Sequence, residues 1–215
     1  SGGNFNVTVG DEAGTAITTG DQNVFVGYAA GDAVVSSSNN VAVGHSALSA
    51  DTLGGRAVGM GASALASQNF TTSTSNYNVA VGFTAGTSIT TGIQNTLIGG
   101  QAGDALTDAD HNVAVGYAAL TDDTLGSKSV AIGRAALFTQ NFTTATDAHN
   151  VGVGYNAGLS VTTGTFNTLL GGLSGDALTV GTRNVAVGKD ALTSDTKGSR
   201  STALGFAALF SQNFT

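Results

Sequence analysis

The stretch Asn112-Val113-Ala114-Val115-Gly116-Tyr117-Ala118-Ala119 occurs, with small changes, twelve times in this chain. Successive copies of its glycine are separated by 17, 17, 17 and then 21 residues, and this pattern occurs three times. The anchor glycines are Gly10, Gly27, Gly44, Gly61, Gly82, Gly99, Gly116, Gly133, Gly154, Gly171, Gly188 and Gly205. The 215 residues therefore form three units of four repeats, which span residues 1–72, 73–144 and 145–215. Repetition this regular predicts a stacked architecture in which each repeat is one structural coil.

Alternating apolar residues precede each anchor glycine, which is taken below as position 0 of its repeat. Positions −3 and −1 are β-branched or apolar, as in Val113 and Val115, so we expect a strand whose −3 and −1 side chains face the core. Position −2 would then face outward. A repeat of 17 residues is too short for a helix pair, but it fits a strand, a glycine turn and a return turn such as Thr18–Gly20. We therefore predict an all-β fold: a parallel β-roll, or β-solenoid, of twelve coils, continuous through the three units and without caps.

Two further patterns indicate how the coils pack. Asparagine occupies position −4 in nine of the twelve repeats, which predicts a ladder of side-chain amides that bond from coil to coil. Its members are Asn6, Asn23, Asn40, Asn78, Asn95, Asn112, Asn150, Asn167 and Asn184. In the second half of each repeat, glycine at +4 accompanies a bulky residue at +7. Leucine at +4 accompanies a polar residue at +7 and, in most cases, a bulky one at +9, as close packing requires.

The fourth repeat of each unit has four extra residues, which predict a bulging loop at about 68–76 and 140–148. Each unit also carries the sequence Asn-Phe-Thr there, which is an acceptor sequence for N-glycosylation in a secreted protein. The candidate acceptors are Asn69, Asn141 and Asn213. In the alternative interpretation, the phenylalanine fills the core at +9 and the polar residues beside it turn the chain.

The composition argues against several classes of function. A net charge of −7 does not suit a nucleic-acid partner, and the chain has no cysteine for a thiol nucleophile or a zinc site. No apolar run approaches the ~20 residues of a membrane span. The three histidines and the acidic pairs share no recurring partner, so we predict no enzyme and no cofactor. Asp32, Asp104 and Asp176 recur in Gly-Asp-Ala, where a corner turn is the favoured interpretation and a calcium ligand the alternative.

The motif Asn-Val-Ala-Val-Gly-x-x-Ala, as in 40–47, 78–85, 112–119 and 184–191, resembles the head repeat of trimeric autotransporter adhesins. It is also similar to repeats in bacteriophage tail fibres. The resemblance covers all twelve repeats and implies a left-handed parallel β-roll, assembled into trimers, on a cell surface or a virion. The chain departs from the adhesin pattern in two respects. Its repeats are longer, and its asparagine is usually adjacent to the valine instead of two positions before it.

The sequence predicts one mode of association and two alternative functions. The small or apolar residues at −2, taken as outward-facing, suggest lateral self-association, with a trimer or an end-to-end filament as more specific forms. The leading function is a rigid, rod-forming spacer in an extracellular fibre or adhesin shaft. The alternative is a module that binds a cell-surface glycan or receptor through aromatic residues at +1. These candidate contact residues are Tyr28, Phe83, Tyr117, Tyr155 and Phe206.

Overall fold

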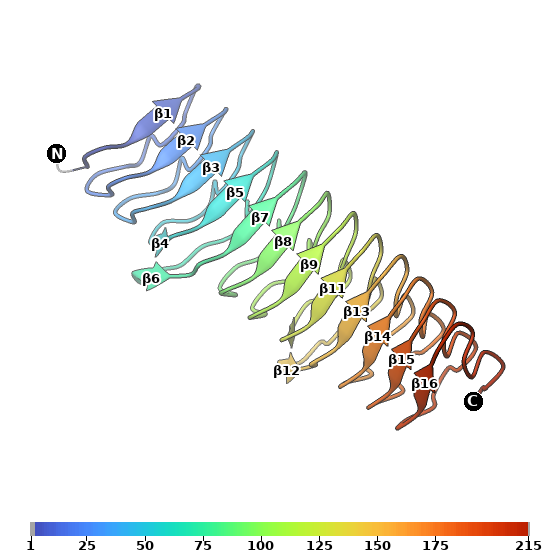
Figure 1. Cartoon of the computed structure of the whole chain (residues 1–215). Helices are drawn as coiled ribbons and strands as arrows, with labels where there is room; N and C mark the ends of the chain where they lie inside the picture. Colours follow the sequence, from blue (N-terminus) through green and yellow to red (C-terminus); the bar gives the residue numbers. More distant parts are fainter. Residues whose placement is uncertain (1–2, 215) are drawn as a thin grey trace.

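A computed structural model describes residues 3–214 of the chain as a straight β-solenoid of twelve coils. The strands of successive coils lie side by side in one row, and the two ends of the chain lie at opposite ends of the rod (Figure 1). No residue from 3 to 214 is helical, so this part of the chain contains no helix that could cross a membrane. The predicted all-β solenoid with coils about 17 residues apart is confirmed.

One parallel sheet of twelve three-residue strands runs the length of the rod. Its strands in spatial order are β1 (Val7–Val9), β2 (Val24–Val26), β3 (Val41–Val43), β5 (Val58–Met60), β7 (Val79–Val81), β8 (Thr96–Ile98), β9 (Val113–Val115), β11 (Val130–Ile132), β13 (Val151–Val153), β14 (Thr168–Leu170), β15 (Val185–Val187) and β16 (Thr202–Leu204). Each strand pairs with the next in a register that places equivalent repeat positions opposite one another, for example Val113 beside Val130. The register continues unchanged across the boundaries between units, as where β5 pairs with β7.

The long fourth coil adds a small second ladder in the first two units. There β4 (Gly54–Gly55) pairs with β6 (Thr74–Ser75), and β10 (Gly126–Ser127) pairs with β12 (Thr146–Asp147). The extra residues bulge out just before β6 and β12, where residues 71–73 and 143–145 are exposed. The bulging loops therefore lie within the ranges expected from the 21-residue spacing.

The core contains a different face of the strand from the one predicted. From the second coil onward, position −2 is buried, whereas positions −3 and −1 are only half-buried or are exposed to solvent. In β9, for instance, Ala114 is fully buried between half-buried Val113 and Val115. The prediction that −3 and −1 form the core was therefore wrong. The apolar −2 residues are the core of this chain, so they do not provide the outer face on which the expected self-association was based.

The physical reason lies in the narrow interior of the coil. Most of the core is built from four columns, at −2, +3, +4 and +7, and Phe70 and Phe142 at +9 add to it in the long coils. The interior of each coil is narrow. Where +4 is glycine, a large −2 residue of the same or the next coil fills the space: a Cβ added to Gly31 would lie 2.7 Å from the ring of Phe25 in its own coil, and one added to Gly86 would lie 2.7 Å from Leu97 in the next coil. Where +4 is leucine, as at Leu120, position −2 is alanine or glycine. This exchange of volume keeps the interior close-packed along the rod.

Candidate functional site

The asparagine column forms a hydrogen-bonded ladder inside the rod, which the fourth coil of each unit interrupts with Ala57, Ser129 or Ser201. The side-chain oxygen of Asn112 accepts the backbone N–H of Ser129 in the next coil at 2.9 Å, and its Nδ2 donates to the carbonyl oxygen of Gly126 at 2.8 Å. The backbone N–H of Asn112 donates in turn to Oδ1 of Asn95 at 2.9 Å. The amide thus satisfies a buried donor and a buried acceptor at each corner. Direct bonds between asparagine side chains also occur, as from Asn184 to Asn167 at 3.1 Å.

The predicted ladder residues occupy equivalent places. Eight of them are buried and Asn6, in the first coil, is partly exposed. At the first unit boundary, where Ala57 has no amide to offer, Asn76 accepts the backbone N–H of Asn78 at 2.9 Å instead. The ladder is a structural device of the interior and is not open to a ligand.

A buried polar relay accompanies the long coil, and the sequence analysis did not identify it. The carboxylate of Asp51 accepts the backbone N–H groups of Gly54 at 2.9 Å and Phe70 at 3.1 Å, and Nε2 of Gln68 donates to its other oxygen at 2.5 Å. Gln68 accepts in turn from Nδ2 of Asn78 at 2.9 Å. Burial raises the pKa of Asp51, although these hydrogen bonds act in the opposite direction.

The second unit repeats this arrangement with Asp123, Gln140 and Asn150. The pKa of Asp123 is also raised by burial. The recurrence of Asp at +7 in the third coil and Gln at +7 in the fourth, in all three units, was a sequence signal for this pair. In the first two units the aspartate and the glutamine at +7 are both fully buried. Polar residues therefore replace apolar ones at +7 there without opening the core to water.

The candidate glycosylation sites lie on the surface of the long coil. Asn69 and Asn141 are exposed, and their side-chain oxygens accept hydrogen bonds from Thr52 and Thr124, each at 3.1 Å. The phenylalanine that follows is buried in both cases, with 6% exposed, so it fills the core at +9. In the third unit Asn213 is exposed, and Thr215 of that acceptor sequence lies outside the described residues.

The corner beside the long coil differs between units. In the first unit Arg56 and several serine side chains, among them Ser36 and Ser73, line an open polar pocket of about 160 Å³. Arg56 donates to the hydroxyl of Ser75, and its guanidinium lies 5.6 Å from the ring centroid of Tyr77.

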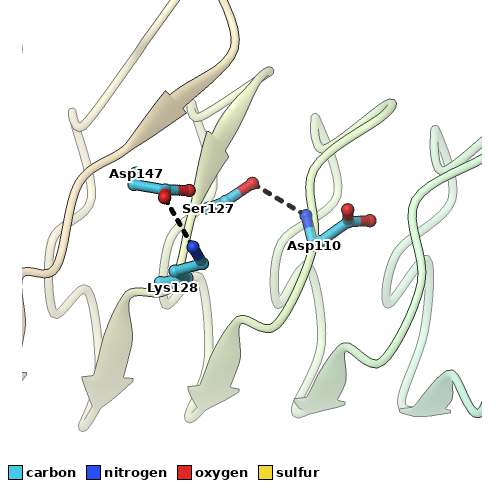
Figure 2. A network of polar contacts seen from close by, with 4 residues as sticks. All are labelled: Asp110, Ser127, Lys128 and Asp147. Carbon is cyan, nitrogen blue, oxygen red and sulfur yellow. Dashed lines mark hydrogen bonds and ion pairs between the residues drawn. The ribbon is translucent and has the colours of Figure 1, made fainter.

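The equivalent corner of the second unit is shown in Figure 2. There Lys128 and Asp147 form an ion pair at 2.5 Å, and the hydroxyl of Ser127 accepts the backbone N–H of Asp110 at 2.9 Å. The hydrogen bond from Lys128 lowers the pKa of Asp147. Both partners of the pair are exposed, so it contributes little to stability. The core repeats from unit to unit, whereas the charged surface does not.

The aromatic residues proposed as ligand contacts stand in the +1 column along the rod. They are between 48% and 76% exposed: Tyr28, Phe83, Tyr117, Tyr155 and Phe206. Some lie against a side chain of the same column in the adjacent coil. The ring of Tyr28 stacks on that of His45 with centroids 5.2 Å apart, and Arg134 lies 5.5 Å from the ring centroid of Tyr155. The structure therefore provides exposed rings in a line along the rod.

A second exposed column, at −5, was not singled out from the sequence. There His149 stacks on Phe166 with centroids 5.3 Å apart, and Arg183 lies 5.5 Å from the same phenylalanine ring. The run of aromatic and basic residues at −5 in the third unit (His149, Phe166, Arg183 and Arg200) was the available signal.

The three recurring aspartates of the Gly-Asp-Ala motif are separated from one another by four coils. Asp32, Asp104 and Asp176 are each half-buried, and each has one carboxylate oxygen without a hydrogen-bond partner. Burial raises the pKa of Asp104 and of Asp176. Residues 3–214 contain no group of three or more His, Asp or Glu side chains that could hold a metal ion.

Comparison of the chain with family models, with curated proteins and with solved structures gave no match.

Proposed function

We propose that this chain is the rigid, rod-forming part of an extracellular fibre or adhesin shaft, on a cell surface or a virion. The observation that carries the proposal is the unbroken register of the twelve-stranded sheet across both unit boundaries. Each coil contacts only its neighbours, so added units lengthen such a rod without changing its cross-section. The motif's resemblance to adhesin heads and phage tail fibres supports the same role. The proposal assigns the chain no catalysis and no resident cofactor.

Electron microscopy of a three-unit and a six-unit version would test the spacer role. The six-unit version, made by joining two copies of residues 1–215 through one added residue that restores the 21-residue spacing, should give straight particles twice as long and equally wide. Particles that are bent at random, or that widen when units are added, would refute a rigid spacer. A version with its units joined by a flexible glycine-serine linker provides the control for a jointed rod.

A second candidate function is glycan binding along the exposed +1 column. Aromatic rings that stand in solvent can stack on the apolar faces of sugar rings, and Tyr117 and Phe83 are 56% and 64% exposed. A glycan array would test this function with the parent protein, with Tyr117→Ala and with Tyr77→Ala. Tyr77 is a matched control because it is 51% exposed but lies outside the +1 column. Binding of a defined sugar that only Tyr117→Ala abolishes would support the second function over the spacer alone.

A further inference from the structure

The outer face of the twelve-stranded sheet is apolar along the whole rod. Positions −3 and −1 point away from the core, and every one of them is valine, isoleucine, leucine, methionine or threonine, without a charged side chain. Large apolar side chains that stay exposed over a continuous surface mark an interaction site in soluble proteins. We name the surface formed by the −3 and −1 side chains of the twelve strands the valine face.

The valine face carries a regular alternation of long and short side chains. From Val43 onward, position −1 is valine in every second coil and a longer residue in the coils between, and only the longer residues are exposed. The longer residues are Met60, Ile98, Ile132, Leu170 and Leu204, with exposed fractions of 42%, 41%, 38%, 36% and 76%. Because successive coils are about 4.8 Å apart, these ridges recur about every 10 Å, with valine hollows between them.

We propose that two copies of this chain pack face to face through their valine faces. A surface with ridges about 10 Å apart needs a partner with the same spacing, and the face of a second copy provides it: shifted by one coil, the ridges of each copy enter the hollows of the other. Because a shift of one coil is compatible with a two-fold axis only when the two rods run antiparallel, the contact is an antiparallel, isologous pair, and it closes. Packing through this face is independent of the spacer role, because a rod could act as a spacer without pairing.

The size and flatness of the valine face suit this partner. Eleven steps of about 4.8 Å and a width of three residues correspond to a projected area of roughly 500 Å² per copy, or ~1,000 Å² for the pair, which is the lower limit for a specific interface. The strands keep a similar direction along the rod (Figure 1), so contact can extend over many coils. The exposed cations and aromatics of the neighbouring +1 column, such as Arg134 and Tyr155, provide a polar border.

Sedimentation equilibrium over a concentration series tests the pairing with the intact 215-residue chain. We expect a species of twice the 21.1 kDa of one chain. The variant Ile98→Lys/Ile132→Lys places charges on two ridges in the middle of the valine face and should be monomeric at every concentration. The matched control, Val180→Lys/Phe210→Lys, adds two lysines at residues that are 45% and 47% exposed and lie outside the face, and it should pair like the parent.

A milder variant separates loss of pairing from loss of the fold. Ile98→Thr/Ile132→Thr shortens two ridges and keeps β-branched residues, as Thr96 and Thr168 already are on this face, so the fold is retained. Its dissociation constant should rise at least about tenfold. A parent chain that stays monomeric, pairing that survives the lysines on the face, or a trimeric mass would each overturn the proposal. If the control Val180→Lys/Phe210→Lys also lost pairing, the contact would not be specific to the valine face, and the proposal would be overturned.

Discussion

At the scale of single residues, the anchor glycine is required by contact as well as by conformation. The twelve anchor glycines have φ between 120° and 142°, a region closed to residues with a Cβ. A Cβ on Gly116 would also lie 2.6 Å from the carbonyl carbon and oxygen of Gly133, the next anchor along the rod. The glycines therefore stack directly on one another.

Gly116→Ala should strongly destabilise the rod, by about 3 kcal/mol or more, because the strained backbone and the next coil must both move. Gly100→Ala is the matched control: a Cβ there would meet no atom closer than the ring of Tyr117, at 3.6 Å, which is an ordinary contact. Urea unfolding followed by circular dichroism should show a much lower midpoint for the first variant and nearly the parent midpoint for the second. Equal midpoints would contradict the stacking argument.

Left-handed backbone conformations extend beyond glycine. Every residue at −5 and at +2, and every leucine at +4, has φ between 50° and 65°. Such conformations cost about 1 kcal/mol or more for a residue with a side chain. The hydrogen bonds and packing that each coil makes with its neighbours must offset this strain, which favours many coils over few.

Asn112→Ala should also destabilise the fold, because it leaves the buried N–H of Ser129 and the buried carbonyl of Gly126 without partners. Each unsatisfied group costs about 1–3 kcal/mol. The same change at Asn6, which is partly exposed in the first coil, should have a smaller effect because water can replace the amide. Hydrogen exchange would check the local effect: the amide of Ser129 should exchange much faster in Asn112→Ala, and unchanged exchange would refute the ladder's role.

At the scale of the coil, the sequence predicted the strands and the glycine turns but assigned the wrong face to the core. Both faces of each strand are apolar, so alternation alone could not decide between −3/−1 and −2. The asparagine at −4 held the missing signal, because −4 and −2 point to the same side of a strand and a ladder of amides needs a buried column. The exchange of volume between Phe25 at −2 and Gly31 at +4 was a second signal.

The site was less predictable than the fold. The +1 aromatics and the acceptor asparagines are exposed as surface features of a regular repeat, and local spacing was sufficient to find them. The Asp51–Gln68 relay joins residues of different coils, so it became evident only when the coils were stacked in register. The contacts at the corner beside the long coil, which differ between the first and second units, also depend on which side chains meet across coils.

The buried relay gives the coil a dependence on pH. Burial raises the pKa of Asp51 and Asp123 above the ordinary 3.8, so the folded chain holds protons that the unfolded chain has released. Stability should therefore rise as the pH falls from neutral through the raised pKa values, and the gain should be complete below 3.8. Thermal unfolding at a series of pH values should show a flatter pH dependence for Asp51→Asn/Asp123→Asn. A parent protein that loses stability over the same range would contradict the burial effect.

At the scale of the whole molecule, the three units form one continuous rod. The 21-residue spacing interrupts the outline of the rod at the long coil but leaves the main sheet in register, because the extra residues bulge outside it. Each 72-residue unit should therefore advance the rod by four coils, or about 19 Å. Both the spacer role and the pairing through the valine face depend on this constant advance.

Distances between pairs of spin labels would measure this constant advance of the rod from unit to unit. The chain has no cysteine, and Thr19, Thr91 and Thr163 are exposed residues at equivalent positions of the three units. Double electron–electron resonance on the three double-cysteine variants, with each labelled chain diluted in unlabelled protein, should give about 19 Å for 19/91 and for 91/163, and about 38 Å for 19/163. A 19/163 distance well short of the sum of the other two, or broad distributions for all three pairs, would contradict a straight rod of regular coils.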